Sequence, residues 1–264
     1  MPELAEVEYY RKQWNPGLGE TIEAVRFNPH VRDFRDCPVK ELAQHLPGRR
    51  LEASQSHGKQ MLFRFEAGAW MGIHLGMTGK LRFSSTDPAP DRHAHLVLAV
   101  PSGWLVFSDP RQFGRILFEI SGQPPDWWTR LPPEILSRDF TLLRLKAAVK
   151  RHGNTSLKSF LLKQHYFPGV GNWMADEILW RARLNPRRTP GSLDDGEIKA
   201  LYRRLRWVCR QSLRIVGDHW GEFPESWLFQ HRWKEGGVCP KTRGSLVRER
   251  IGGRTTCWSP QWQR

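Results

Sequence analysis

The spacing of apolar residues along the chain changes at about residue 120. Before that point, apolar residues form short runs that Gly, Pro and Ser separate, a pattern typical of antiparallel strands. After about residue 140 they recur every three or four positions, which is the period of an amphipathic helix. The sequence therefore predicts an α+β, multidomain protein in which a β-rich part precedes a helical part.

The β-rich part is expected to start with a helix. Ala5 to Trp14 have the pattern of a short amphipathic helix, and Asn15-Pro16-Gly17 would end it. Strands are expected at residues 62–65, 70–75, 81–83, 95–100, 104–107 and 115–120. Strands of this length and spacing are typical of a sandwich or a barrel.

The helical part contains four helix patterns and is followed by a hairpin. The helices are expected at residues 140–152, 156–164, 173–183 and 194–216. Within residues 245–264, Ile251-Gly252-Gly253 lies between two short strand patterns and has the composition of a hairpin turn. We therefore expect a β-sandwich domain at residues 1–121, a linker at 122–136, a helical domain at 137–216, and a Trp-rich segment with the hairpin at 217–264.

The charge of the chain indicates the class of its partner. Its 264 residues include 41 Lys and Arg and 27 Asp and Glu, so the net charge is +14. Such a charge suits a polyanion, and nucleic acid is the commonest one. A membrane surface is the competing interpretation, but the sequence has no apolar run of transmembrane length and no basic, apolar signal segment at its start. We expect a cytoplasmic monomer, associated with the nucleoid if the source is bacterial.

The N-terminal stretch carries the residues best suited to covalent chemistry. If Met1 is removed, the new terminus is Pro2, whose α-amino group is secondary and only weakly basic, with a pKa near ~8. A secondary amine that attacks a sugar aldehyde carbon gives an iminium ion, which makes neighbouring bonds easier to break. Glu3 and Glu6 lie within a turn of that amine and are candidate proton carriers. The alternative is structural: Pro2 would occupy the first turn of a helix, and the acids would favour its positive end.

A second candidate site is the turn Pro168-Gly169-Val170-Gly171-Asn172, between two expected helices. Two glycines let a backbone approach a ligand closely, and Asn172 is expected to cap the following helix. The free N–H groups at a helix N-terminus suit a phosphate. A plain corner between two helices would have the same pattern.

Together these stretches resemble the formamidopyrimidine-DNA glycosylase/endonuclease VIII family, and the likeness extends over nearly the whole chain. It rests on six motifs in the family's order: Pro2-Glu3-Leu4-Ala5-Glu6-Val7-Glu8, Gly58-Lys59, His74-Leu75-Gly76-Met77-Thr78-Gly79, Asp109-Pro110-Arg111-Gln112-Phe113-Gly114, Gly169-Val170-Gly171-Asn172 and Gly253-Arg254-Thr255-Thr256. The resemblance implies an N-terminal β-sandwich with a leading helix, and a C-terminal helix–two-turn–helix domain that ends in a β-hairpin. It also implies a bifunctional DNA glycosylase/AP lyase of base excision repair that forms a Schiff base and completes β- and δ-elimination.

The resemblance assigns catalytic roles to four residues. The family's nucleophile falls on Pro2 and its proton-transferring acid on Glu3. A second, supporting acid falls on Glu6, and a lysine that contacts phosphate near the lesion falls on Lys59. The expected partner is double-stranded DNA with an oxidised base or an abasic site, with a lean towards formamidopyrimidine- and 8-oxoguanine-type purines.

Six further positions are implied to contact DNA. A damaged base must leave the stack before its sugar can be reached, so the family fills the vacated space with three side chains. Apolar wedges and a hydrogen-bonding arginine suit that space, and other basic residues neutralise phosphates. The void-filling trio falls on Met77, Arg111 and Phe113, and the backbone-clamping roles fall on Lys158, Asn172 and Arg254.

The sequence departs from the family in three places. Many relatives have a zinc finger of four cysteines, whose spacing falls here on Cys239, Thr242, Ser259 and Trp262. Thr and Ser are poor substitutes for a thiolate and Trp cannot bind zinc, so we expect no metal or other cofactor and a zincless finger held by Trp258 and Trp262. The remaining cysteines, Cys37, Cys209 and Cys257, complete no C-x-x-C pair. Lys163-Gln164 replaces an acidic residue, and Asp218 to Gly237 differs from the loop that covers oxidised purines.

Two other classes of function remain compatible with these patterns. A non-catalytic protein on the same fold would bind damaged or abasic DNA without cleaving it. An RNA-binding protein would have a similar charge, because net charge does not distinguish the two polymers. Trapping with borohydride on abasic DNA separates the first alternative from the enzyme, and competition by RNA separates the second.

Overall fold

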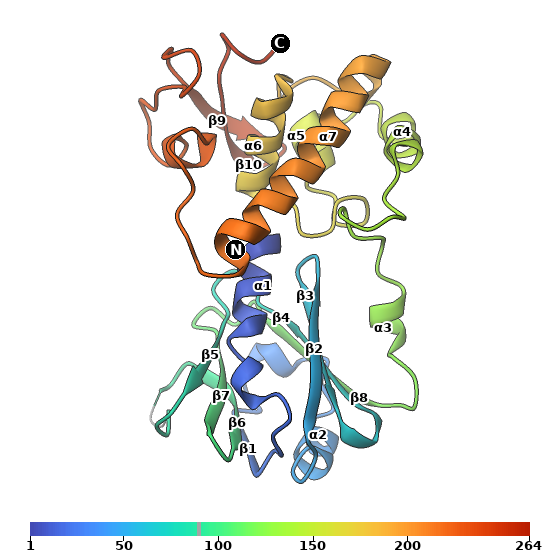
Figure 1. Cartoon of the computed structure of the whole chain (residues 1–264), viewed down its shortest axis with the longest axis vertical. Coiled ribbons are helices and arrows are strands. Elements are labelled where there is room, and N and C mark those ends of the chain that lie inside the picture. Colours follow the sequence, from blue (N-terminus) through green and yellow to red (C-terminus); the bar gives the residue numbers. More distant parts are fainter. Residues whose placement is uncertain (89–90) are drawn as a thin grey trace. The chain divides into compact units, whose positions relative to one another are not determined.

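The structure is a computed structural model that describes residues 1–88 and 91–264, and it divides into two compact units (Figure 1). The first unit contains Met1–Pro2 and Glu6–Leu131, and the second contains Glu3–Ala5 and Pro132–Arg264. The first unit is rich in strands and the second in helices. The predicted α+β fold class is confirmed.

Two four-stranded antiparallel sheets form the first unit. Their strand orders are β1-β6-β7-β5 and β2-β3-β4-β8. The strands are β1 (Ala24–Phe27), β2 (Leu51–His57), β3 (Gln60–Phe65), β4 (Ala69–His74), β5 (Lys80–Ser84), β6 (Ala94–Val100), β7 (Gly103–Ser108) and β8 (Arg115–Ile120). Alternate side chains of both sheets, among them Phe63, Met71, Leu98 and Phe107, belong to one buried core, so this unit is a β-sandwich.

The first unit also contains short helices, of which α1 bears on the site. The α-helices are α1 (Leu4–Lys12), α2 (Val39–His45) and α3 (Asp126–Thr129), and the 3-10 turns are η1 (Asn15–Gly17), η2 (Arg32–Phe34) and η3 (Glu66–Gly68). Trp14, just after α1, is fully buried against Phe63 and donates its indole N–H to the Val106 carbonyl at 3.3 Å. A Cβ at Gly17 would lie 2.7 Å from Leu105, so the chain turns tightly against the core at the end of this helix. The sandwich core therefore anchors the C-terminal end of α1.

Elements that the hydrophobic pattern did not reveal lie at the margins of the sandwich. β1 and β2 are edge strands, and the exposed side of an edge strand tolerates polar residues. Leu51 is the one fully buried residue of β2, whose other side chains are at least partly exposed. β2 thus lacks the short apolar run on which the six predicted strands depended, whereas β5 and β8, which are also edge strands, have one.

Four α-helices and a hairpin make up most of the second unit. They are α4 (Leu142–Arg151), α5 (Leu157–Leu161), α6 (Asn172–Ala182), α7 (Asp195–Ser212), β9 (Val247–Ile251) and β10 (Arg254–Trp258), with 3-10 turns η4 (Pro190–Ser192) and η6 (Leu228–His231). Helix α7 continues into a π-helical turn at Leu213–Gly217. The Thr141 and Ser156 side chains and an Asp194–Glu197 capping box start α4, α5 and α7, respectively. The hairpin turn is the pair Gly252-Gly253, because Ile251 and Arg254 are still paired.

One of the arginines of α7 has a structural role. Arg206 donates to the carbonyl oxygens of Ile135 (2.6 Å), Leu136 (3.1 Å) and Ser137 (3.0 Å). It thereby holds residues 135–137, which precede α4, against α7. Arg203 and Arg210 are exposed, as expected of a solvated face. Among the described residues, no helix is both long and apolar enough to cross a membrane.

Candidate functional site

The carboxylate of Glu3 occupies the N-terminus of α6. Its two oxygens accept the backbone N–H groups of Gly171, Trp173 and Met174, each at 3.0 Å. Glu3 is 2% exposed, and the N–H of Leu4 donates to the Gly169 carbonyl at 3.0 Å. Helix N-termini favour anions because their N–H groups lack partners within the helix. The phosphate expected at this helix end is thus replaced by the chain's own Glu3.

The turn before α6 is shaped to receive that carboxylate. A Cβ at Gly171 would lie 2.2 Å from Cδ of Glu3, so a side chain there would displace the acid. Gly169 has φ +88°, which favours glycine. Gln164 braces the turn: its Oε1 accepts the Gly169 N–H (3.2 Å), and its Nε2 donates to the Val170 carbonyl (2.7 Å). A carboxylate at position 164 could not make the second bond, which gives a reason for the departure from the family.

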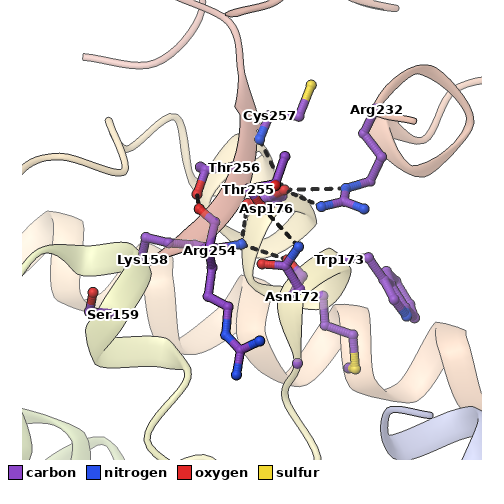
Figure 2. Close-up of polar contacts among 12 residues, drawn as sticks. Lys158, Ser159, Asn172, Trp173, Asp176, Arg232, Arg254, Thr255, Thr256 and Cys257 are labelled. Atoms are coloured by element: carbon purple, nitrogen blue, oxygen red, sulfur yellow. Dashed lines mark hydrogen bonds and ion pairs between the residues drawn. The ribbon is translucent and has the colours of Figure 1, made fainter. Parts of the chain in front are cut away.

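Asn172 does not cap α6, contrary to the expectation from sequence. The N-cap is Gly171, and Asn172 is the first residue of the helix. Its Nδ2 donates to the carbonyl of Thr255 on β10 at 2.9 Å, which fixes the hairpin beside the helix N-terminus. Its Oδ1 is buried and has no hydrogen-bond partner within the described residues. Arg254, one position before Thr255, is exposed, and its guanidinium points away from Asp176 (Figure 2).

Lys158 is buried and belongs to an ion cluster that is centred on Asp176 (Figure 2). Its Nζ donates to Asp176 (2.5 Å) and to the Asn172 carbonyl (2.6 Å), and Asp176 also pairs with Arg232 (2.6 Å) and accepts the Cys257 N–H (3.0 Å). Burial lowers the pKa of Lys158, and the Asp176 carboxylate opposes that shift. The ammonium group is fully buried, so this placement differs from the direct phosphate contact that the resemblance implies. Lys158 instead supports Asn172 and, through Asp176, the hairpin.

The expected void-filling residues lie on two loops that are joined to each other. The loop after β7 is organised by Asp109, which accepts the N–H of Gly114 (2.7 Å) and the hydroxyl of Thr78 from the loop after β4 (2.5 Å). Gly76 in the same loop has φ +59°, and a Cβ there would lie 2.3 Å from the backbone of Phe113. The two loops therefore pack backbone to backbone.

The tips of these loops expose the three predicted side chains. Met77 is 41% exposed and Phe113 is 42% exposed, which is unusual for large apolar residues. The Arg111 guanidinium lies 4.9 Å from the ring centroid of Phe113, a cation–π distance. The structure brings Arg111 and Phe113 into contact and joins their loop to that of Met77.

Lys59 occupies a tight turn beside His74. Gly58-Lys59 links β2 to β3, and Gly58 has φ +60°. Burial, together with the positive charges of Lys59, Arg35 and Arg115, lowers the pKa of His74 to about 4. The neutral ring accepts the Gly76 N–H at its Nδ1 (3.0 Å).

The two remaining predicted residues lie on and before α1. Pro2 and Glu6 are partly exposed, and Pro2 is linked through one peptide bond to the clamped Glu3. The clamp therefore limits where the residue before Glu3 can lie.

The C-terminal finger is held by packing. Trp262 donates its indole N–H to the Trp180 carbonyl (3.0 Å), and the Arg183 guanidinium lies 3.8 Å from the centroid of the Trp262 ring. Burial raises the pKa of the Cys239 thiol, but hydrogen bonds from Thr242 and Trp180 outweigh burial and lower the pKa to about 7. With Trp262 engaged in this packing, the family's four ligand positions do not fit a zinc ion.

Sequence reasoning missed several residues that position the site. Gln164, Asp176 and Arg232 carry no motif of their own. For Asp176 a signal was available: it lies four residues after Asn172, on the same side of a helix that is otherwise buried. A buried acid in that position requires a cation, and the chain supplies two.

Two family models match the chain, one over each unit's main part. Residues 1–116 match the formamidopyrimidine-DNA glycosylase N-terminal domain, and residues 131–221 match the formamidopyrimidine-DNA glycosylase H2TH domain. The chain is 35% identical over 276 residues to a formamidopyrimidine-DNA glycosylase of Thermus thermophilus, covering 100% of this chain and 98% of that protein. It is 31% identical over 276 residues to that of Carboxydothermus hydrogenoformans, with both chains covered completely.

Solved structures agree with these matches. The crystal structure of a Thermus thermophilus formamidopyrimidine-DNA glycosylase superposes with a TM-score of 0.81 at 33% identity, covering 99% of this chain and 98% of the other. A Lactococcus lactis formamidopyrimidine-DNA glycosylase bound to DNA with an AP site has the same fold, with a TM-score of 0.88 at 23% identity and 99% of both chains covered. The resemblance drawn from the six motifs is confirmed: the chain belongs to the formamidopyrimidine-DNA glycosylase family.

Proposed function

We propose that this chain is a bifunctional DNA glycosylase/AP lyase that removes oxidised bases from double-stranded DNA in base excision repair. The observation that carries the proposal is the clamped carboxylate of Glu3. A buried acid, held by three backbone N–H groups, stands next to a proline that becomes the terminal amine when Met1 is removed. An amine nucleophile with an adjacent positioned acid is the arrangement that Schiff-base chemistry requires.

The reaction would start with attack of the Pro2 amine on C1′ of a flipped nucleotide. The new N–C1′ bond forms as the glycosidic bond breaks, and the damaged base leaves with a proton. The C1′–O4′ bond then breaks as O4′ takes up a proton, and the opened sugar carries an iminium ion at C1′. This ion acidifies C2′, so loss of a C2′ proton expels the 3′ phosphate, and a second elimination expels the 5′ phosphate. Glu3 is the proposed proton carrier, with Glu6 in a supporting role, and Lys59 is the proposed phosphate contact near the lesion.

Several features support a DNA duplex as the partner. The net charge is +14, and Arg254, at the start of β10, and Arg111, in the loop after β7, are exposed. The exposed Met77 and Phe113 suit insertion into a base stack, where apolar side chains replace the stacking of a flipped base. Solved Lactococcus lactis relatives are described in complex with abasic-site DNA and with DNA that contains an oxidised pyrimidine.

For the lesion itself we propose oxidised purines opposite cytosine. Arg111 and Phe113 support this preference, because an arginine beside an aromatic ring can hydrogen-bond the unpaired cytosine. The segment after α7 differs from that of many relatives: it presents Trp220, which is 47% exposed and has φ +53°. The expected cytoplasmic location and monomeric state remain predictions, and sedimentation equilibrium tests the latter.

A cleavage assay over a panel of lesions tests the proposed function. Duplexes would carry a formamidopyrimidine, 8-oxoguanine, an oxidised pyrimidine, an abasic site or no damage. We expect nicking of the oxidised-purine and abasic duplexes, with both flanking phosphates left on the products. Tight binding of abasic duplex without any nicking would favour the non-catalytic alternative, and equal competition by RNA would favour an RNA-binding protein.

A further inference from the structure

The loop after β7 is held by a segment that has no role in the chemistry above. The backbone N–H of Arg32, at the start of η2, donates to Gln112 Oε1 at 3.2 Å. Just after η2, the Arg35 guanidinium donates to the Gly114 carbonyl at 2.8 Å. Gln112 has φ +54°, a conformation that costs a non-glycine residue free energy and that surrounding contacts must maintain. The η2 segment supplies contacts of that kind.

A buried chain of three titratable groups lies between η2 and this loop. Asp33 and Asp109 are fully buried, and His95 is 2% exposed. His95 Nδ1 lies 2.6 Å from Asp33 Oδ2, and the charge of the neighbouring Asp109 acts on the Asp33 carboxyl group. Both carboxyls border Gly114, because a Cβ there would be 2.5 Å from Asp33 Oδ1 and 3.1 Å from Asp109 Oδ2.

If Asp33 and Asp109 were both ionised, the group of three buried residues would be one hydrogen-bond donor short. Asp109 accepts from Thr78, Gly114 and the N–H of Arg111 (3.3 Å), so both of its carboxyl oxygens already serve as acceptors. Asp33 Oδ1 is buried and finds no donor within the described part of the chain. Burial raises the pKa of Asp33, and the charge of Asp109 raises it further, against the opposing effect of His95. Two carboxyls that share a site retain a proton between them.

We propose that Asp33 is a positioning residue: its carboxyl group holds a proton towards Asp109 and thereby fixes the loop that presents Arg111 and Phe113 to DNA. The proton gives Asp33 Oδ1 the partner that it lacks, and Asp33 Oδ2 accepts from His95. Loss of the proton would place two negative charges together in a site closed to water. Asp109 would then move, and with it the loop. This inference rests on the proposed function, since it assumes that the loop enters DNA.

Few groups besides these face Asp33. His95 lies on β6 and Asp109 directly follows β7, and both belong to the buried group of titratable residues described above. Arg35, from the same segment as Asp33, binds the loop at the Gly114 carbonyl. The ring of Phe107 lies against His95, with centroids 6.5 Å apart. The state of Asp33 is therefore transmitted to the loop mainly through Asp109.

The test compares Asp33→Asn with Asp33→Ala in an assay of loop insertion. Each protein is bound to a duplex with an uncleavable tetrahydrofuran abasic analogue and a fluorescent adenine analogue in the opposite strand, from about pH 5 to about pH 9. The Asn amide can donate to Asp109 at every pH and accept from His95, whereas Ala can do neither. We expect Asp33→Asn to give the full fluorescence change at all pH values and Asp33→Ala to lose it. Cleavage of natural abasic duplex by Asp33→Ala should fall on the order of tenfold to a hundredfold.

The controls separate this inference from the proposed function. Asp126→Asn removes an equal charge from an exposed position in α3 and should behave as wild type. Because the analogue is not cleaved, insertion can be read even if the wild-type protein proves to lack lyase activity. Normal insertion by Asp33→Ala, or equal loss in Asp33→Asn and Asp33→Ala, would overturn the inference.

If a variant does not fold, an NMR measurement on the wild-type protein tests whether an aspartate carboxyl is protonated. With aspartate labelled at ¹³Cγ, a protonated carboxyl gives a distinct carbon signal. Glu177, whose pKa burial raises to about 7, is not labelled and does not contribute. We expect one such signal at the pH at which insertion is complete, with loss of the signal and loss of insertion at the same pH. Absence of a protonated aspartate under inserting conditions would overturn the inference.

Discussion

At the scale of single residues, the site depends on the absence of a side chain at Gly171. We predict that Gly171→Ala lowers single-turnover cleavage of abasic duplex on the order of a hundredfold, because the new Cβ would lie 2.2 Å from Glu3 Cδ and displace the acid. Gly122→Ala is the matched control, since a Cβ there meets nothing within 4 Å. Binding of the uncleavable analogue should change far less than cleavage. Full cleavage by Gly171→Ala would mean that Glu3 need not lie at the helix N-terminus.

His74 should make the protein sensitive to acid. Its pKa is about 4 in the folded protein and 6.5 for the free side chain, so the unfolded state binds more protons between these values. The stability due to neutral His74 is complete above pH 6.5 and is lost as the pH falls towards 4, by roughly 3 kcal/mol at most. Urea unfolding of wild type, His74→Asn and the exposed-site control His30→Asn measures this effect. If the acid sensitivity of His74→Asn equals that of wild type, His74 is not the group responsible.

The sequence indicated the residues that could act chemically but not those that hold them. Roles for Pro2, Glu3 and Arg254 were predicted because their motifs have fixed order and spacing. Gln164 and Asp33 were not, since their roles depend on contacts with segments distant in the sequence. Lys158 was expected to clamp the DNA backbone, and its burial could not be predicted without knowing that Asp176 faces it.

At the scale of elements, the finger hairpin should be independent of metal. We predict that extended EDTA treatment leaves cleavage and the thermal midpoint unchanged, because Trp262, Trp180 and Arg183 hold the segment together. Elemental analysis of the purified protein should give well under one zinc per chain. Stoichiometric zinc, with activity lost on chelation and restored by the metal, would contradict this account of the finger.

The elements that the sequence predicted are those with a strong hydrophobic period. β6 is buried along nearly its whole length and α7 has one buried face, so their patterns could be interpreted. Edge strands such as β2 and the short helix α2 lacked such a pattern, because much of their surface meets solvent. The turn of the hairpin was predicted to within one residue for a different reason: two consecutive glycines between two short strand patterns are typical of a hairpin turn.

At the scale of the whole molecule, the charge of +14 predicts binding that weakens steeply with salt. We expect Arg254→Ala to weaken binding to all duplexes alike and to reduce the slope of log K against log salt by about 1. Arg254 is exposed at the start of β10, so its loss should not unfold the hairpin. The comparison variant is Arg130→Ala, an exposed arginine of the segment after α3. An unchanged slope in Arg254→Ala would remove the hairpin from the DNA contacts.

The central claim is that the terminal amine of Pro2 is the nucleophile, and one measurement tests it directly. The protein is incubated with abasic duplex and borohydride, and the trapped complex is digested and mapped by mass spectrometry. The account predicts that the sugar is attached to the peptide that begins at Pro2, with Met1 absent. It also predicts that protein that retains Met1 gives no adduct while it still binds the duplex. Attachment to an internal lysine such as Lys59, or trapping by protein that retains Met1, would contradict the account.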